Sequence, residues 1–150
     1  MPCASTKVKD RLGPKMIRSY SEMLQFDTLE DRFEYLALRA SVGMATFGFD
    51  RWLNQQFYSS RAWKQARQRV VVRDNGCDLG VDGYDIHSRI IIHHMNPIDA
   101  EQLVQGDESV FDPEFLICTT HNTHNAIHYG DRNLLPKQYI DRRRGDTKLW

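Results

Sequence analysis

The sequence predicts one mixed α+β domain in which helices come first and a short strand–loop–helix unit follows. Apolar residues recur at helical spacing in two segments before residue 74, and a β-branched run at 89–94 comes after them. The 150 residues are 41% hydrophobic and 27% charged, a globular composition that excludes collagen-like, disordered and disulfide-scaffold proteins. No apolar run approaches the ~18 residues that cross a bilayer. We therefore expect a cytoplasmic protein with no membrane partner.

Four segments are expected along the chain. Residues 1–26 have weak periodicity and are predicted to form a partly ordered arm. A helical N-terminal region at 27–60 precedes the core at 61–135, and 136–150 form a basic C-terminal tail. Three scattered cysteines, an odd number, suit a reducing compartment better than a disulfide framework.

Three helices are predicted before the strand. Thr28 can cap the first, which is expected to end before Gly43. A second helix is expected at about 50–57. Ser60 can cap a third at 61–73, which the turn-forming residues after it bring to an end.

The β structure is predicted in two places. A short strand near 78–81, a turn at 82–83 and the run at 89–94 indicate a β-hairpin. Residues 116–118 have the pattern of a further short strand. A final helix at about 120–129 is predicted to begin at a threonine cap and to stop at a glycine.

The six histidines all lie between residues 87 and 128. His93 and His94 are adjacent at the end of a predicted strand, so their side chains face opposite sides, and one can bind metal while the other acts as acid or base. His124 and His128 are four residues apart on a predicted helix and can chelate one cation. Each pair alone is common by chance, but the strand–loop–helix order of the two pairs favours a metal site.

These residues resemble the HNH nucleases. The resemblance rests on 91–97 (IIHHMNP), 112–116 (DPEFL) and 124–130 (HNAIHYG), and the helix and turn at 61–77 are similar to the segment that leads into that core. It implies a ββα-metal (His-Me finger) core with additional N-terminal helices. More weakly, the full length is similar to small HNH proteins of phages and prophages, which would place the protein in a bacterial host cytoplasm.

The resemblance also implies a role for each histidine of the two pairs. His94 would be the general base that takes a proton from the attacking water, while His93, His124 and His128 would be metal ligands. It implies one divalent ion, which can be Mg, Mn, Ni or Zn, and DNA cleavage that leaves 5′-phosphate and 3′-hydroxyl ends. Further candidates for phosphate contact or for support of the site are His121, Asn96, Asn122 and Asn125.

The sequence departs from the family pattern in two respects. Phe115 stands where the pattern has its middle Asn, which orients the base histidine, so Asn96 or Asn122 would have to replace it. Many relatives also hold a structural zinc with two Cys-x-x-Cys pairs. Here Gly80 stands where the second cysteine of a pair with Cys77 would be, and Thr120 and Thr123 stand at the positions of the second pair. These replacements argue against a structural zinc.

The net charge of zero conceals charged blocks that bear on the predicted DNA partner. Segment 99–114 is acidic, and we expect it to lie away from the DNA cleft or to form a flap. Segment 61–73 carries five bases and no acid, and beside a nuclease core these are predicted to contact phosphates. They are Arg61, Lys64, Arg67, Arg69 and Arg73.

Two other functions remain open from the sequence. One is a non-catalytic DNA-binding or phage packaging-accessory module, with phage packaging proteins as partners and a structural zinc held by the histidines. The other is a structural protein in which the histidine cluster is fortuitous and takes up no metal.

Overall fold

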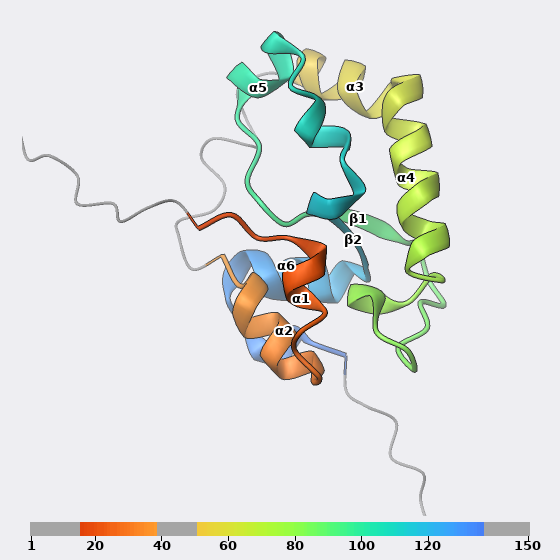
Figure 1. Cartoon of the computed structure of the whole chain (residues 1–150), viewed down its shortest axis with the longest axis vertical. Helices are drawn as coiled ribbons and strands as arrows, with labels where there is room; N and C mark the ends of the chain where they lie inside the picture. The colour runs from red at the N-terminus through yellow and green to blue at the C-terminus, as the bar shows by residue number, and fades with distance from the viewer. Residues whose placement is uncertain (1–15, 39–50, 137–150) are drawn as a thin grey trace, which may run out of the picture.

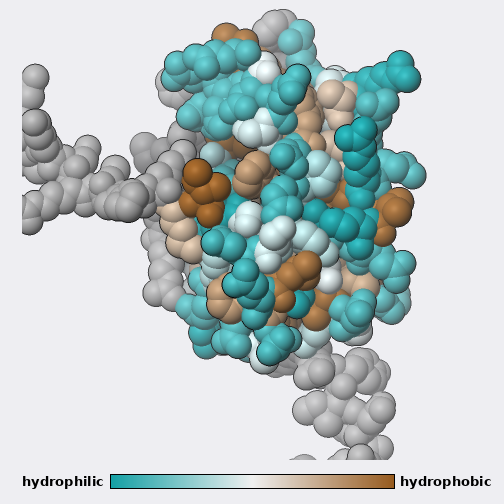
Figure 2. All heavy atoms as spheres, in the orientation of Figure 1, coloured by the Kyte–Doolittle hydropathy of each residue, from teal (hydrophilic) through white to brown (hydrophobic). Residues whose placement is uncertain are grey.

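The computed structural model describes residues 16–38 and 51–136, and these form a mixed α+β fold. In Figure 1 the two strands lie in the middle of the molecule, with α4 along one side of them and α1, α2 and α6 grouped together. The face seen in Figure 2 is largely hydrophilic, with apolar side chains in separate spots. No helix in this part of the chain has the length and apolar character needed to span a membrane.

Part of the expected N-terminal arm is a packed element of the fold. Residues 1–15 lie outside the described residues, but α1 (Tyr20–Met23) follows directly and its Met23 is fully buried. The described residues of the predicted arm, 16–26, therefore include an ordered helix, and the rest of that segment lies outside the described residues. One buried side chain in a four-residue helix leaves no periodic signal, which is why the pattern did not reveal it.

The next helix, α2 (Leu29–Leu36), begins as predicted and ends earlier. The Thr28 side chain accepts a hydrogen bond from the backbone N–H of Asp31. Ala37 then leaves the helical conformation, and the N–H of Leu38 donates to the carbonyl of Ile127 in the last helix, 3.0 Å away. A tertiary contact thus ends α2 before the expected stop at Gly43, which lies outside the described residues.

The two helices that lead to the sheet agree with the prediction. They are α3 (Arg51–Ser59) and α4 (Arg61–Arg73), and Ser60 caps α4 by accepting from the N–H of Trp63. Trp63, Ala66 and Val70 form the buried face of α4.

The predicted hairpin between 78–81 and 89–94 is wrong. The strand β1 (Ile91–His94) pairs antiparallel with β2 (Leu116–Thr119) instead. Residues Asp78–Gly80 form a 3-10 turn, in which Leu79 has φ 53°. The paired residues are Ile91 with Thr119, Ile92 with Cys118, His93 with Ile117 and His94 with Leu116.

The acidic segment between the strands is folded. It holds α5 (Ala100–Gln105) and the 3-10 turns η2 (Glu108–Phe111) and η3 (Pro113–Phe115). A capping box between Asp99 and Gln102 begins α5. Val110 of η2 is buried and its carbonyl contacts His94, so this part of the segment lies beside the strand that carries the histidine pair. That the segment lies away from the DNA cleft or forms a flap stays a prediction.

The sheet separates two apolar clusters, and this positions the histidines. On the side of α6 (His121–Tyr129), Ile117 packs with Ala126 and Ile127 and with residues of α1 and α2. On the side of α4, Leu116 and Cys118 pack with Trp63 and other residues of the second cluster. Since side chains alternate along a strand, the register sends His93 to the α6 side and His94 to the α4 side.

Candidate metal centre

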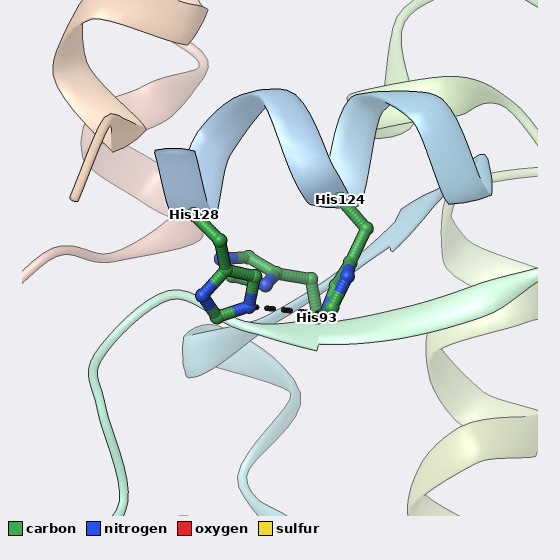
Figure 3. Close-up of side chains that lie close together, drawn as sticks. All are labelled: His93, His124 and His128. Carbon is green, nitrogen blue, oxygen red and sulfur yellow. Dashed lines mark hydrogen bonds between the residues drawn. The ribbon is translucent and has the colours of Figure 1, made fainter. Parts of the chain in front are cut away.

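Three imidazoles converge between β1 and α6 (Figure 3). His93 projects from the strand, and His124 and His128 project from successive turns of the helix. Each offers a ring nitrogen, and these three atoms all lie within 4.8 Å of one another. The spacing of four residues on α6 therefore places the two helical histidines side by side, as predicted.

Two buried nitrogens of this cluster have no hydrogen-bond partner among residues 16–38 and 51–136: Nε2 of His93 and Nδ1 of His128. The His93 side chain is only 1% exposed. A buried polar atom without a partner is costly, about 1–3 kcal/mol, and a buried unsatisfied group often marks a site whose ion or water is missing. The cluster therefore fits a cation better than it fits a packed apolar core.

Burial keeps the imidazoles neutral, which is the form that binds metal. It lowers the pKa of His93 well below the ordinary value of 6.5, with the neighbouring histidines adding to the effect. Burial likewise lowers the pKa of His124, and that of His128 to about 4. All three rings are therefore neutral at neutral pH, and each has one nitrogen with a free lone pair and one that carries a proton. Because the Nε2 atoms of His124 and His128 share a proton, that proton has to move to another ring nitrogen or to solvent when both atoms bind one ion.

The spacing of the helical pair matches ligation. The Nε2 atoms of His124 and His128 are 3.0 Å apart and share a hydrogen bond. With metal–nitrogen distances of 2.0–2.1 Å, two ligands on a tetrahedral ion lie about 3.3 Å apart. Replacing the shared proton by a cation would thus move these two atoms by only a few tenths of an ångström.

His94 lies on the other face of the strand, in an aromatic setting. Its ring stacks on Trp63 with centroids 5.1 Å apart and an interplanar angle of 18°. Its Nε2 lies 3.1 Å from the carbonyl oxygen of Val110. Because a carbonyl only accepts, Nε2 carries the proton and Nδ1 holds the lone pair. Burial lowers the pKa of His94 to about 4, so the ring is neutral at neutral pH.

The Val110 carbonyl is the hydrogen-bond partner that orients the His94 ring. Phe115 is partly buried and lines a pocket of about 260 Å³ together with His94 and Val110. The sequence could not reveal the carbonyl, because any residue type supplies one.

The other polar residues predicted near the site have different partners. Asn96 uses its side-chain amide to bind the backbone of Arg18, and therefore does not orient His94. Asn122 is exposed, and the side chain of Asn125 lies 3.1 Å from Nε2 of His121. His121 is exposed too and is not part of the three-histidine cluster.

The five predicted phosphate-binding bases fall into two groups. Arg73 donates to the carbonyls of Pro113 and Leu116 and pairs with Asp74, so its contacts are internal. Arg67 donates to a backbone carbonyl at 3.1 Å. The exposed members on α4 are Arg61, Lys64 and Arg69.

A buried aspartate connects the turn after Cys77 to the start of α6. Asp78 is 1% exposed, and its carboxylate accepts from the backbone N–H of Thr120 and from the hydroxyls of Thr120 and Thr123. This role could not be predicted from the sequence, since a single aspartate in a turn looks like an ordinary surface residue.

Comparisons with family models, curated proteins and solved structures found no match for this chain.

Proposed function

We propose that the protein is a metal-dependent endonuclease that hydrolyses DNA phosphodiester bonds. The observation that carries this proposal is the three-imidazole cluster of His93, His124 and His128, with His94 next to it on the same strand. Among the described residues the cluster has three candidate ligands, and catalytic metal sites characteristically have three protein ligands and an open position. We also infer that β1, β2 and α6, which follow one another in the order ββα, form a ββα-metal core.

In this proposal each residue has a distinct task. His93, His124 and His128 hold a divalent ion, which, when bound, supplies positive charge to the phosphate and to the leaving 3′ oxygen. His94 accepts a proton from the attacking water at Nδ1, while the Val110 carbonyl holds its Nε2–H. The stack on Trp63 restricts the rotation of the ring. The water oxygen forms a bond to phosphorus as the P–O3′ bond breaks, and the 3′ oxygen takes up a proton from solvent, which leaves 5′-phosphate and 3′-hydroxyl ends.

The three-ligand set also separates this function from a non-catalytic module with a structural zinc. Structural zinc sites are almost always closed by four protein ligands. Such a module would therefore need a fourth ligand from outside the described residues, and it would bind DNA without cutting it.

A plasmid assay tests the proposal. Supercoiled DNA is incubated with chelator-treated protein to which Mg, Mn, Ni or Zn is added, and nicked and linear products are followed. We expect wild type to cleave DNA in at least one metal. His93→Ala should lose both metal binding and cleavage, whereas His94→Ala should keep metal binding and lose cleavage. His87→Ala, at an exposed histidine outside the cluster, is the matched control. Equal cleavage by wild type and His94→Ala in every metal would refute the assignment.

A further inference from the structure

The chain segment before α1 is fastened to the end of the strand that carries the histidine pair. The side chain of Asn96 accepts from the backbone N–H of Arg18 at 2.8 Å and donates to the Arg18 carbonyl at 2.9 Å. Both backbone groups of one residue are thus held by one amide, two positions after His94. This double contact fixes where the Arg18 side chain starts.

The Arg18 side chain extends from there to the end of α2. Its Nε donates to the carbonyl of Tyr35 at 2.8 Å, and Nη2 lies 3.4 Å from the carbonyl of Ala37. The next residue, Leu38, donates its N–H to the carbonyl of Ile127, directly before His128. The guanidinium therefore lies at the end of α2, which is bonded to α6 through Leu38, while the Arg18 backbone is bonded to Asn96, two residues after the end of β1.

The guanidinium has no ion-pair partner in the parts of the chain that the structure describes. Its Nη1 group has no hydrogen-bond partner there either. The positive charge of Arg18 is also felt at the cluster, where it is one of the smaller causes that lower the pKa of His93, after burial and the neighbouring histidines.

The charges of a bound divalent ion and of Arg18 together favour the binding of an anion at this site. Three neutral imidazoles neutralise none of the charge of a divalent ion, and the described residues add no carboxylate to the cluster. A nearby arginine makes the site with a bound metal ion still more positive. The repulsion between the metal ion and the guanidinium disfavours metal binding alone, and an anion that contacts both of them removes this repulsion. Arginine suits a phosphate in that place, because its donors match the geometry of phosphate oxygens.

We propose that Arg18 is a phosphate-binding residue of this site, which contacts a nonbridging oxygen of the phosphodiester beside the histidine cluster. The inference rests on the proposed nuclease function and adds to it a part of the site that comes from the N-terminal segment. Asn96 then acts as a positioning residue, because it holds the backbone from which Arg18 reaches the site.

Three variants of the full chain test this. Arg18→Gln removes the charge, Arg18→Lys keeps it, and Arg89→Gln removes one charge from an exposed side chain before β1. Thermal unfolding of each variant identifies any change that comes from misfolding. Nickel affinity without DNA is measured by titration, and we expect Arg18→Gln to bind nickel at least as tightly as wild type, since a repelling charge is gone.

DNA binding is measured in nickel on a His94→Ala background, with a short duplex and a series of salt concentrations. A charge-assisted hydrogen bond contributes about 1.5–3 kcal/mol, so Arg18→Gln should weaken duplex binding on this background roughly ten- to a hundredfold. In the protein that keeps His94, Arg18→Gln should lower kcat/KM for cleavage by a similar factor. Loss of one phosphate contact should also reduce the salt slope by about 0.9. Arg18→Lys should recover part of the loss, and Arg89→Gln should match wild type.

The two proposals fail in different ways. If wild type cuts plasmid and Arg18→Gln binds and cuts like Arg89→Gln, the Arg18 inference is wrong and the nuclease proposal stands. If wild type cuts in no metal, the nuclease proposal is wrong. The binding measurements are made in either case, and an unchanged salt slope in Arg18→Gln overturns the role of Arg18.

Discussion

Replacing His93 by leucine should stabilise the metal-free protein and remove its response to metal. The His93 ring is 1% exposed, and its buried Nε2 has no hydrogen-bond partner in the part of the chain that the structure describes. Leucine is a side chain of comparable size that fills the same place without a polar atom. The change therefore removes an unsatisfied group from the interior together with a ligand from the proposed metal site.

The expected magnitude follows from these two facts. An unsatisfied buried polar atom costs about 1–3 kcal/mol, and a near-isosteric change in a packed core costs less than about 1.5 kcal/mol. The net gain for His93→Leu without metal is therefore about 1 kcal/mol. Wild type at a metal concentration of 100 times Kd gains about 2.7 kcal/mol, because metal binds the folded state only. The order of stability should thus invert when metal is added.

Urea unfolding followed by tryptophan fluorescence measures this inversion. Both proteins are unfolded in EDTA and again in nickel chloride, and the free energies of unfolding are compared. His87→Leu, at an exposed histidine, should respond to nickel like wild type. If His93→Leu in EDTA is less stable than wild type by more than about 1 kcal/mol, or if nickel stabilises both proteins equally, the reasoning about the unsatisfied nitrogen is wrong.

Four further predictions concern the contacts around the site. Asp78→Ala should lower the free energy of unfolding by roughly 2–4 kcal/mol, measured by calorimetry, because its buried donors lose a carboxylate. Burial raises the pKa of Asp78 above 3.8, so the folded state holds the proton more tightly than the unfolded state does. Stability should therefore fall as pH rises from about 3.8 through the folded pKa, a trend that urea unfolding should show to be missing in Asp78→Asn. Arg73→Met should cost roughly 3 kcal/mol in urea unfolding, since it leaves the carboxylate of Asp74 buried without its charge partner. Long-range ¹⁵N–¹H NMR should show His94 protonated at Nε2, and a proton at Nδ1 instead would contradict its bond to the Val110 carbonyl.

The features that the sequence predicted are those that depend on neighbours along the chain. The helix α4 begins at its serine cap, and α6 begins at Thr120 and ends at Gly130, in the left-handed conformation typical of a glycine there. The facing of His124 and His128 follows from helical periodicity alone. The three-histidine cluster was therefore within reach of sequence reasoning once the helix and the strand were recognised.

The features that the sequence missed depend on contacts between distant residues. The partner of β1 is β2, more than twenty residues later, because a folded acidic segment connects them and residues 78–80 turn instead of pairing. Arg18 and Asn96 are 78 positions apart, and their contact leaves no periodic pattern. The Val110 carbonyl and the buried Asp78 carboxylate likewise act through positions that only the tertiary fold supplies.

The strand register is what makes the two adjacent histidines chemically different. Because His93 pairs with Ile117 and His94 with Leu116, the first enters the cluster with α6 and the second stacks on α4. A slip of one residue would exchange the faces of both, and would also turn Ile117 out of its apolar cluster. The apolar packing of β2 on both faces therefore holds the register, and with it the separation of the proposed metal ligand from the proposed base. Two short strands are enough for this, because a single pair of strands already keeps the imidazoles of His93 and His94 on opposite faces of the sheet.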